Sequence, residues 1–118
     1  MTSPQLLCIQ ENLVSLSKKN RMVGSFLYDR FGESVARVEG LLVEPETYRL
    51  RFLVIRMGGF LGTGGKRVII PEEVCEVKDL GKITTAWTRE SLSDAPCPAD
   101  VHHVTENERS LIRSYFDL

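Results

Sequence analysis

Between residues 20 and 86 the chain alternates short apolar stretches with clusters of turn-forming residues. Within the stretches, apolar and polar positions often alternate with a period of two, which is typical of strands that bury one face. The separating segments are rich in glycine, proline and charged residues, which favour turns. Several short strands at regular intervals predict a mainly β fold, a small antiparallel barrel or sandwich. Strands are expected at residues 22–28, 34–43, 48–56, 66–70, 74–79 and 82–86.

The N-terminal segment has the spacing of a helix rather than of a strand. Ser3 and Pro4 suit a helix start, since serine caps the first turn and proline is tolerated there. Apolar residues follow at intervals of three and four, which predicts a short amphipathic helix over residues 3–16. These apolar residues are Leu6, Ile9, Leu13 and Leu16.

Two helices are expected after the strands. Thr88 is a candidate N-cap, and Trp87 and Leu92 around it have the spacing of a hydrophobic staple, which predicts a helical turn near residues 88–93. Thr105 and Glu108 have the spacing of a capping box, which predicts a second helix over residues 106–116. The chain is thus expected to comprise an N-terminal extension, a barrel and a C-terminal extension, at residues 1–19, 20–86 and 87–118.

Alternation along the strands assigns the side chains that fill the barrel. The expected core is Phe26, Val38, Leu42, Leu50, Phe52, Val54, Val68 and Ile70. The opposite face of the central strands is also apolar, so it requires a cover: the terminal helices, a second protomer, or both. We expect a homodimer, with this face and the last helix as the interface. The candidate interface residues are Leu41, Val43, Leu53, Ile55, Leu111, Ile112, Tyr115 and Phe116.

Charge and cysteine content narrow the class of protein. The 15 Lys and Arg residues nearly balance 16 Asp and Glu residues, so bulk nucleic-acid binding is not expected. No apolar run approaches the roughly 20 residues of a membrane span, so direct membrane insertion is not expected either. The first residues lack the basic start of a secretory signal. Three widely spaced cysteines suit a reducing compartment, and a cytoplasmic location is predicted.

The glycine-rich segment at residues 58–65 invites comparison with a phosphate-binding loop. Such a loop needs a hydroxyl residue after its lysine and a helix that follows, whereas here Lys66 precedes Arg67 and an expected strand. We therefore expect a hairpin whose glycines adopt positive φ, with Phe60 and Leu61 folded over one end of the barrel.

Residues of the kinds found in metal and catalytic sites gather in one proline-rich stretch. Cys97, His102 and His103 could be imagined as metal ligands, but a structural zinc needs four ligands and neither other cysteine has a suitable spacing. Adding Asp100 supplies the residue types of a nucleophilic triad, but no oxyanion-forming turn is recognisable. No catalytic residue, metal ligand or cofactor is therefore predicted.

Several segments together resemble the PRC-barrel family, in the order in which the family has them. They are Gly24–Asp29, Gly32–Glu33, Val38–Thr47, Leu53–Ile55, Gly59–Gly62 and Val68–Pro71. The C-terminal extension is similar to the one that follows the barrel in stand-alone bacterial members, at Leu92, Ala95–Pro96, Asp100, Thr105, Glu108 and Tyr115–Phe116. Two positions depart from the family pattern, since Ala36 replaces a usual glycine and Glu44 a usual aspartate.

The family takes its name from the H subunit of the photosynthetic reaction centre, and the same domain forms half of a ribosome maturation factor. The resemblance implies a PRC-type barrel that serves as a non-catalytic interaction or assembly module, here self-associating and docking to a larger complex. One alternative is a ribosome- or RNA-processing-associated barrel, supported by basic residues at Lys18–Arg21, Arg49, Arg51 and Lys66–Arg67. Another is an auxiliary factor of a photosynthetic complex, attached through a protein partner.

Overall fold

The structure, a computed structural model, describes residues 5–58, 64–79 and 81–118. The chain is mainly β, as predicted. Its strands are β1 (Leu7–Ile9), β2 (Phe26–Tyr28), β3 (Ser34–Val43), β4 (Leu50–Met57), β5 (Lys66–Pro71), β6 (Cys75–Asp79) and β7 (Lys82–Thr85). Its helices are the 3-10 turns η1 (Lys18–Asn20) and η2 (Glu72–Val74) and the α-helices α1 (Arg89–Ser93) and α2 (Glu106–Tyr115).

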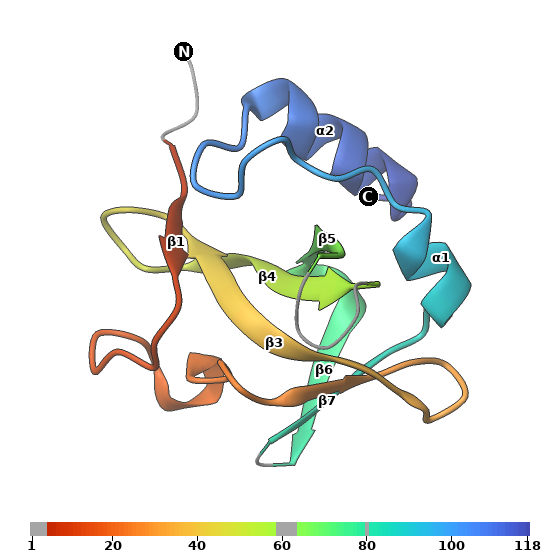
Figure 1. The fold of residues 1–118 in the computed structure, drawn as a ribbon. Coiled ribbons are helices and arrows are strands. Elements are labelled where there is room, and N and C mark those ends of the chain that lie inside the picture. The colour runs from red at the N-terminus through yellow and green to blue at the C-terminus, as the bar shows by residue number, and fades with distance from the viewer. Residues whose placement is uncertain (1–4, 59–63, 80) are drawn as a thin grey trace.

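The strands form one strongly bent sheet in the order β5-β4-β3-β2-β7-β6, with β1 added beside β3 (Figure 1). The long strand β3 makes this bend possible, because its first half pairs with β2 and its last residues pair with β1. Two details differ from the expected antiparallel barrel. β2 and β7 run parallel, and β5 and β6 end the sheet without pairing to each other in the described residues. The short turn η2 carries the chain from β5 to β6, and β7 then pairs antiparallel with β6 and parallel with β2.

The N-terminal segment is not a helix within the described residues. Instead β1 pairs antiparallel with β3, with Leu7 opposite Val43 and Ile9 opposite Leu41. A short isolated helix is marginal in water, whereas the edge of β3 offers unpaired backbone groups. Gly40 lets the two backbones approach, since a Cβ there would lie 3.0 Å from the carbonyl oxygen of Ile9. The helical spacing of the leucines therefore did not predict the element that forms.

Both faces of the central strands are buried within a single chain. Leu41, Val43, Leu53 and Ile55 are at most 1% exposed, so the apolar patch expected to form a dimer interface is not on the surface. The C-terminal extension helps to cover the sheet, and Figure 1 shows α1 and α2 gathered on the β5 side. Its buried contributions to the core are Leu92, Ala95, Val101, Val104, Ile112 and Phe116. The sequence left open the terminal helices, a second protomer or both as the cover, and the face with Leu41 and Leu53 is buried without a second protomer.

The residues predicted for the barrel core are buried except at one position, although the opposite face of the central strands is equally buried. Seven of its members are at most 6% exposed: Val38, Leu42, Leu50, Phe52, Val54, Val68 and Ile70. Phe26 is the exception at 39% exposed, because its neighbour Leu27 points inward and is fully buried. Successive side chains of a strand face opposite sides of the sheet. Because Leu27 points into the core, Phe26 points outward.

Local signals at the C-terminal helices are confirmed. The Thr88 side chain accepts a hydrogen bond from the Ser91 amide at the start of α1. Thr105 and Glu108 form the predicted capping box of α2. Trp87 packs edge-on against Phe116, with ring centroids 4.9 Å apart, and this contact ties the end of the sheet to the end of α2.

The glycine-rich segment lies largely outside the described residues, and so do Phe60 and Leu61. The strands on either side of it pair antiparallel from Met57 opposite Lys66 onward. Gly65 has φ of 78°, and a Cβ there would lie 2.7 Å from the carbonyl oxygen of Met57. Glycine is therefore required at this position for both its conformation and its close approach.

Candidate functional site

Aromatic side chains line the outer side of β2. Because Leu27 enters the core, Phe26 and Tyr28 on either side of it face outward. Phe26 lies opposite Arg37 of β3 and opposite Lys82 of β7. A register irregularity between Leu27 and Tyr28 adjusts the strand locally. The three neighbouring strands thus bring two aromatic rings and two cations to one surface.

The cations lie over the rings. The Arg37 guanidinium carbon is 4.7 Å from the centroid of the Phe26 ring, and the Lys82 ammonium is 5.0 Å from that of Tyr28. Such contacts contribute about 0.5–1 kcal/mol each at exposed sites, enough to orient the side chains. Among the described residues, neither Arg37 nor Lys82 forms an ion pair. We call these four residues the aromatic–cation face.

The hairpin of β6 and β7 extends this surface. β6 is the end strand of the sheet, its residues after Cys75 are exposed, and Val77 is 47% exposed. Glu76 pairs with Lys78 at 3.0 Å, whereas Asp79 is the acid of β6 in register with Lys82, with no ion pair between them. Figure 1 shows this hairpin projecting away from α2, so the C-terminal extension leaves it uncovered.

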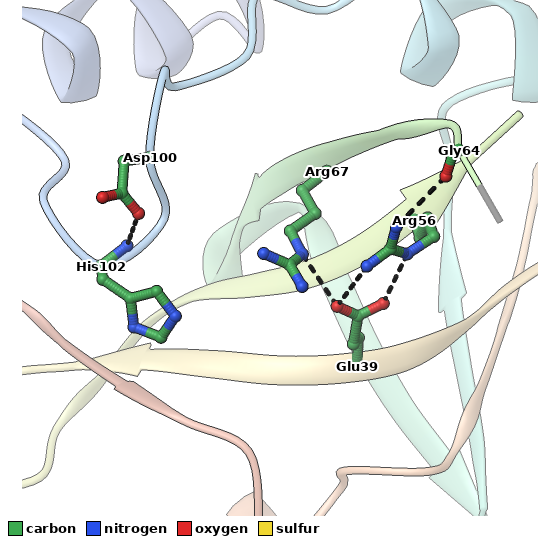
Figure 2. Close-up of polar contacts among 6 residues, drawn as sticks. All are labelled: Glu39, Arg56, Gly64, Arg67, Asp100 and His102. Atoms are coloured by element: carbon green, nitrogen blue, oxygen red, sulfur yellow. Dashed lines mark hydrogen bonds and ion pairs between the residues drawn. The ribbon is translucent and has the colours of Figure 1, made fainter. Parts of the chain in front are cut away.

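A second polar cluster lies where β3, β4 and β5 meet. The two carboxylate oxygens of Glu39 accept hydrogen bonds from Arg56 at 3.0 and 3.3 Å, and one of them accepts from Arg67 Nε at 2.9 Å (Figure 2). Arg56 also donates to the Gly64 carbonyl at 3.1 Å. Arg56 and Arg67 are paired residues of β4 and β5, and Glu39 sits at a register shift in β3. Such a bulge redirects a side chain, here toward both arginines.

The arginines change the acidity of Glu39. Hydrogen bonding from Arg56, and then from Arg67, outweighs partial burial and holds the pKa of the carboxyl below its ordinary value of 4.5. The same hydrogen bond with Glu39 raises the pKa of Arg56. Glu39 and Arg56 are therefore charged at neutral pH, and one carboxylate accepts hydrogen bonds from two guanidinium groups.

A cavity of about 420 Å³ adjoins this cluster. Its walls are the start of β5 and the connector between α1 and α2, at residues 94–105. Asp100 of the connector accepts from the His102 amide at 2.9 Å and contacts His103 Nδ1 at 3.0 Å, which lowers the pKa of Asp100. Glu108 of α2 accepts from the Ala99 amide at 2.9 Å, so the capping box also holds the connector. The cavity is lined by Arg56, Gly65, Lys66, Arg67, Cys97, Pro98, Ala99, Asp100 and Val101.

Of the residues that the sequence suggested as ligands or catalysts, the structure brings Asp100 and His103 into contact at 3.0 Å. His102 and His103 are exposed, whereas Cys97 is partly buried in the cavity wall. Within the described part of the chain, no three His, Cys, Asp or Glu side chains are grouped to hold a metal ion. In the same residues, no helix has the length and apolar character of a membrane span.

The four residues of the last helix that were expected at the interface differ in how far their side chains are exposed. Leu111 is 56% exposed, Tyr115 is partly buried, and Ile112 and Phe116 are at most 2% exposed.

The two polar surfaces, the aromatic–cation face and the Glu39 cluster, were not predicted from the sequence. Placing Phe26 in the core concealed the aromatic–cation face. The Glu39 cluster had one signal, since Arg56 and Arg67 flank the glycine-rich segment and would pair across a hairpin.

The bent sheet, its short end strands and its helical C-terminal cover define a small β module, and the comparisons identify the family. The family model of the PRC-barrel domain matches residues 17–85, and the chain belongs to that family. An uncharacterized protein of Deinococcus radiodurans is 33% identical over 85 residues, which cover 72% of this chain. The match covers 30% of that relative's length, so the relative is much longer than the shared region.

Proposed function

We propose that this PRC-barrel chain is a non-catalytic docking module that binds an acidic segment of a partner protein on the aromatic–cation face. The family supports a non-catalytic barrel module. The observation that carries the proposal is the pairing of Phe26 with Arg37 and of Tyr28 with Lys82, in which Phe26 and both cations are exposed. Aromatic residues and arginine are enriched at protein interfaces and are frequent among the residues that dominate binding energy.

Charge decides which partner fits. Arg37 and Lys82 are exposed and have no acidic partner among the described residues, so carboxylates of a docked segment would pair with them. The ring faces beneath the cations offer apolar contact to the rest of the segment. Because exposed charges are screened by salt, binding should weaken as ionic strength rises.

The sequence predicts self-association through an apolar face of the central strands, and that face is not available on the surface. The strand residues of the expected interface are buried within the chain, so a dimer would have to use another surface. RNA is the second candidate for the aromatic–cation face, because bases stack on aromatic rings and phosphates pair with cations. A photosynthetic or ribosomal complex would fit the proposal only through an acidic protein segment.

A binding assay with defined probes tests the proposal. A fluorescent peptide of alternating glutamate and leucine, its lysine counterpart and a single-stranded RNA are titrated with the protein, and anisotropy is measured. We expect binding of the acidic peptide alone, weakened at least tenfold in the double variant Arg37→Glu/Lys82→Glu. The control is Arg49→Glu, which makes the same charge change as either single reversal, at an exposed position of the turn between β3 and β4.

The outcomes separate the candidates. Loss of peptide binding in the double variant and its retention in Arg49→Glu support the proposal. RNA binding without peptide binding, lost in the same double variant, would assign the face to nucleic acid instead. If neither probe binds, or if both variants bind equally, the proposed function is wrong.

A further inference from the structure

We infer that the cavity beside Arg67 binds a single oxyanionic group, a carboxylate or a phosphate, of a small molecule. This site lies between β5 and the connector and is distinct from the aromatic–cation face. Three cationic side chains line it, namely Arg56, Lys66 and Arg67. Carboxylate and phosphate are the groups that guanidinium ions bind with two parallel hydrogen bonds.

Positive charge is in excess at this site. Among the described residues, Glu39 is the one acid bound to Arg56 and Arg67, which share its single negative charge. Lys66 adds a third cation and has no ion pair among the described residues. Asp100 lines the cavity, but its oxygens contact the amide of His102 and the ring of His103 in its own loop. One net positive charge remains even when Asp100 is counted.

Arg67 has donors left for a ligand. It contacts Glu39 through Nε, and its two terminal nitrogens form no hydrogen bond with the described residues. Figure 2 shows its guanidinium between Glu39 and the loop that carries Asp100 and His102. Glu39 therefore fixes the group while the terminal nitrogens remain available on the side of the cavity.

The walls of the cavity are held before any ligand arrives. Arg56 is fixed on Glu39 and on the Gly64 carbonyl, and the connector is fixed by Glu108 through the Ala99 amide. A ligand would therefore order few side chains on binding, which lowers the entropic cost.

A second arginine cluster in the protein lacks this excess of charge. Arg51, Arg109 and Arg113 surround a smaller cavity of about 220 Å³ beside α2. Arg51 pairs with Glu44 at 2.9 Å and Arg113 with Glu73 at 2.8 Å. Glu106 also lines this cavity, so three arginines face three glutamates. The Nε of Arg109 is buried and has no hydrogen-bond partner among the described residues. This cluster supplies a matched control.

Amide chemical shifts test the inference with inorganic phosphate and acetate as separate probes, and sodium chloride at equal ionic strength as the control. We expect phosphate or acetate to shift the amides of Lys66, Arg67 and residues 97–101 in a saturable way that chloride does not reproduce. Arg67→Gln should weaken binding about tenfold or more, as expected for a lost charge-assisted hydrogen bond. Arg51→Gln should bind like the wild type.

Two further variants keep the test decisive. Glu39→Gln keeps a side-chain oxygen that can accept from the arginines but removes the competing negative charge, so it should tighten binding, a direction that damage to the fold would not produce. Lys66→Gln replaces Arg67→Gln if the latter fails to fold. Wild-type binding by Arg37→Glu/Lys82→Glu would separate this site from the proposed docking function. Equal shifts with chloride, or unchanged affinity in both Arg67→Gln and Lys66→Gln, would overturn the inference.

Discussion

Leu111 and Ile112 are neighbours on α2, yet the Leu111 side chain is 56% exposed and the Ile112 side chain is 1% exposed. Successive residues of an α-helix point about 100° apart, so one of two adjacent apolar side chains can be buried while the other is exposed to solvent. Phe116, one turn beyond Ile112, is also buried, and both belong to the core. The family match ends at residue 85, so this part of the core comes from outside the matched region.

Shortening these two neighbours should give opposite results. Ile112→Ala should lower the free energy of unfolding by about 2–5 kcal/mol, because it leaves a cavity in the core. Leu111→Ala should change it by no more than about 0.5 kcal/mol, as at other exposed positions. Urea denaturation measures both. Equal losses for the two variants would show that α2 does not pack as described.

Leu53→Asp should unfold the protein rather than dissociate a dimer. Leu53 is 1% exposed within the chain, so a carboxylate there would be buried without a partner, at a cost of several kcal/mol. Circular dichroism reports the fold, and sedimentation of the wild type reports whether it self-associates. A folded, monomeric Leu53→Asp variant beside a dimeric wild type would restore this strand as the interface.

Phe52 and Phe26 form a matched pair for the assignment of faces. Phe52 is 1% exposed, so Phe52→Ala should cost about 3–5 kcal/mol. Phe26 is 39% exposed, so Phe26→Ala should cost much less, mainly its contact with Arg37. Thermal melting compares the two variants. A larger loss at Phe26 would mean that the face of β2 is reversed.

Acid should weaken the protein partly through Glu39. Its pKa is lower in the folded chain than its ordinary value of 4.5, so the ionised form stabilises the fold above that pH. This contribution is lost as the pH falls through the lower, folded value. Its size is about 1 kcal/mol or less, because the pair is partly exposed and screened. Unfolding of Glu39→Gln should therefore depend less on pH below 4.5, and an unchanged slope would contradict the assignment.

Cys75 should be the slowest of the three thiols to react. Cys75 as a residue is partly exposed, but burial of its thiol raises the pKa to about 12. Burial also raises the pKa values of Cys8 and Cys97. Since the thiolate is the nucleophile, alkylation by iodoacetamide near pH 8 should be slow at all three in the folded protein. Mass spectrometry maps the labels, with urea-unfolded protein as the reference. Labelling of Cys75 at the unfolded rate would show that its thiol is accessible.

The elements whose signals are local could be predicted from the sequence. The capping box at Thr105 and Glu108 places the start of α2 through hydrogen bonds that span one helical turn. Alternation places β3 at residues 34–43, because the period of a strand is a property of neighbouring residues. The mainly β class and the lack of an evident catalytic motif followed from the same short-range patterns.

Contacts between distant residues were decided by the tertiary structure alone. β1 forms because β3 offers it an edge, although residues 3–16 have a helical spacing. Phe26 faces outward because Leu27 fits the interior better, a choice that alternation by itself leaves open. Leu41 and Leu53 are buried within one chain and need no second protomer, and it is Phe52, on the opposite face of β4, that shares a cavity wall with α2. Short-range patterns state which side chains must be buried, but only the packed chain decides what buries them.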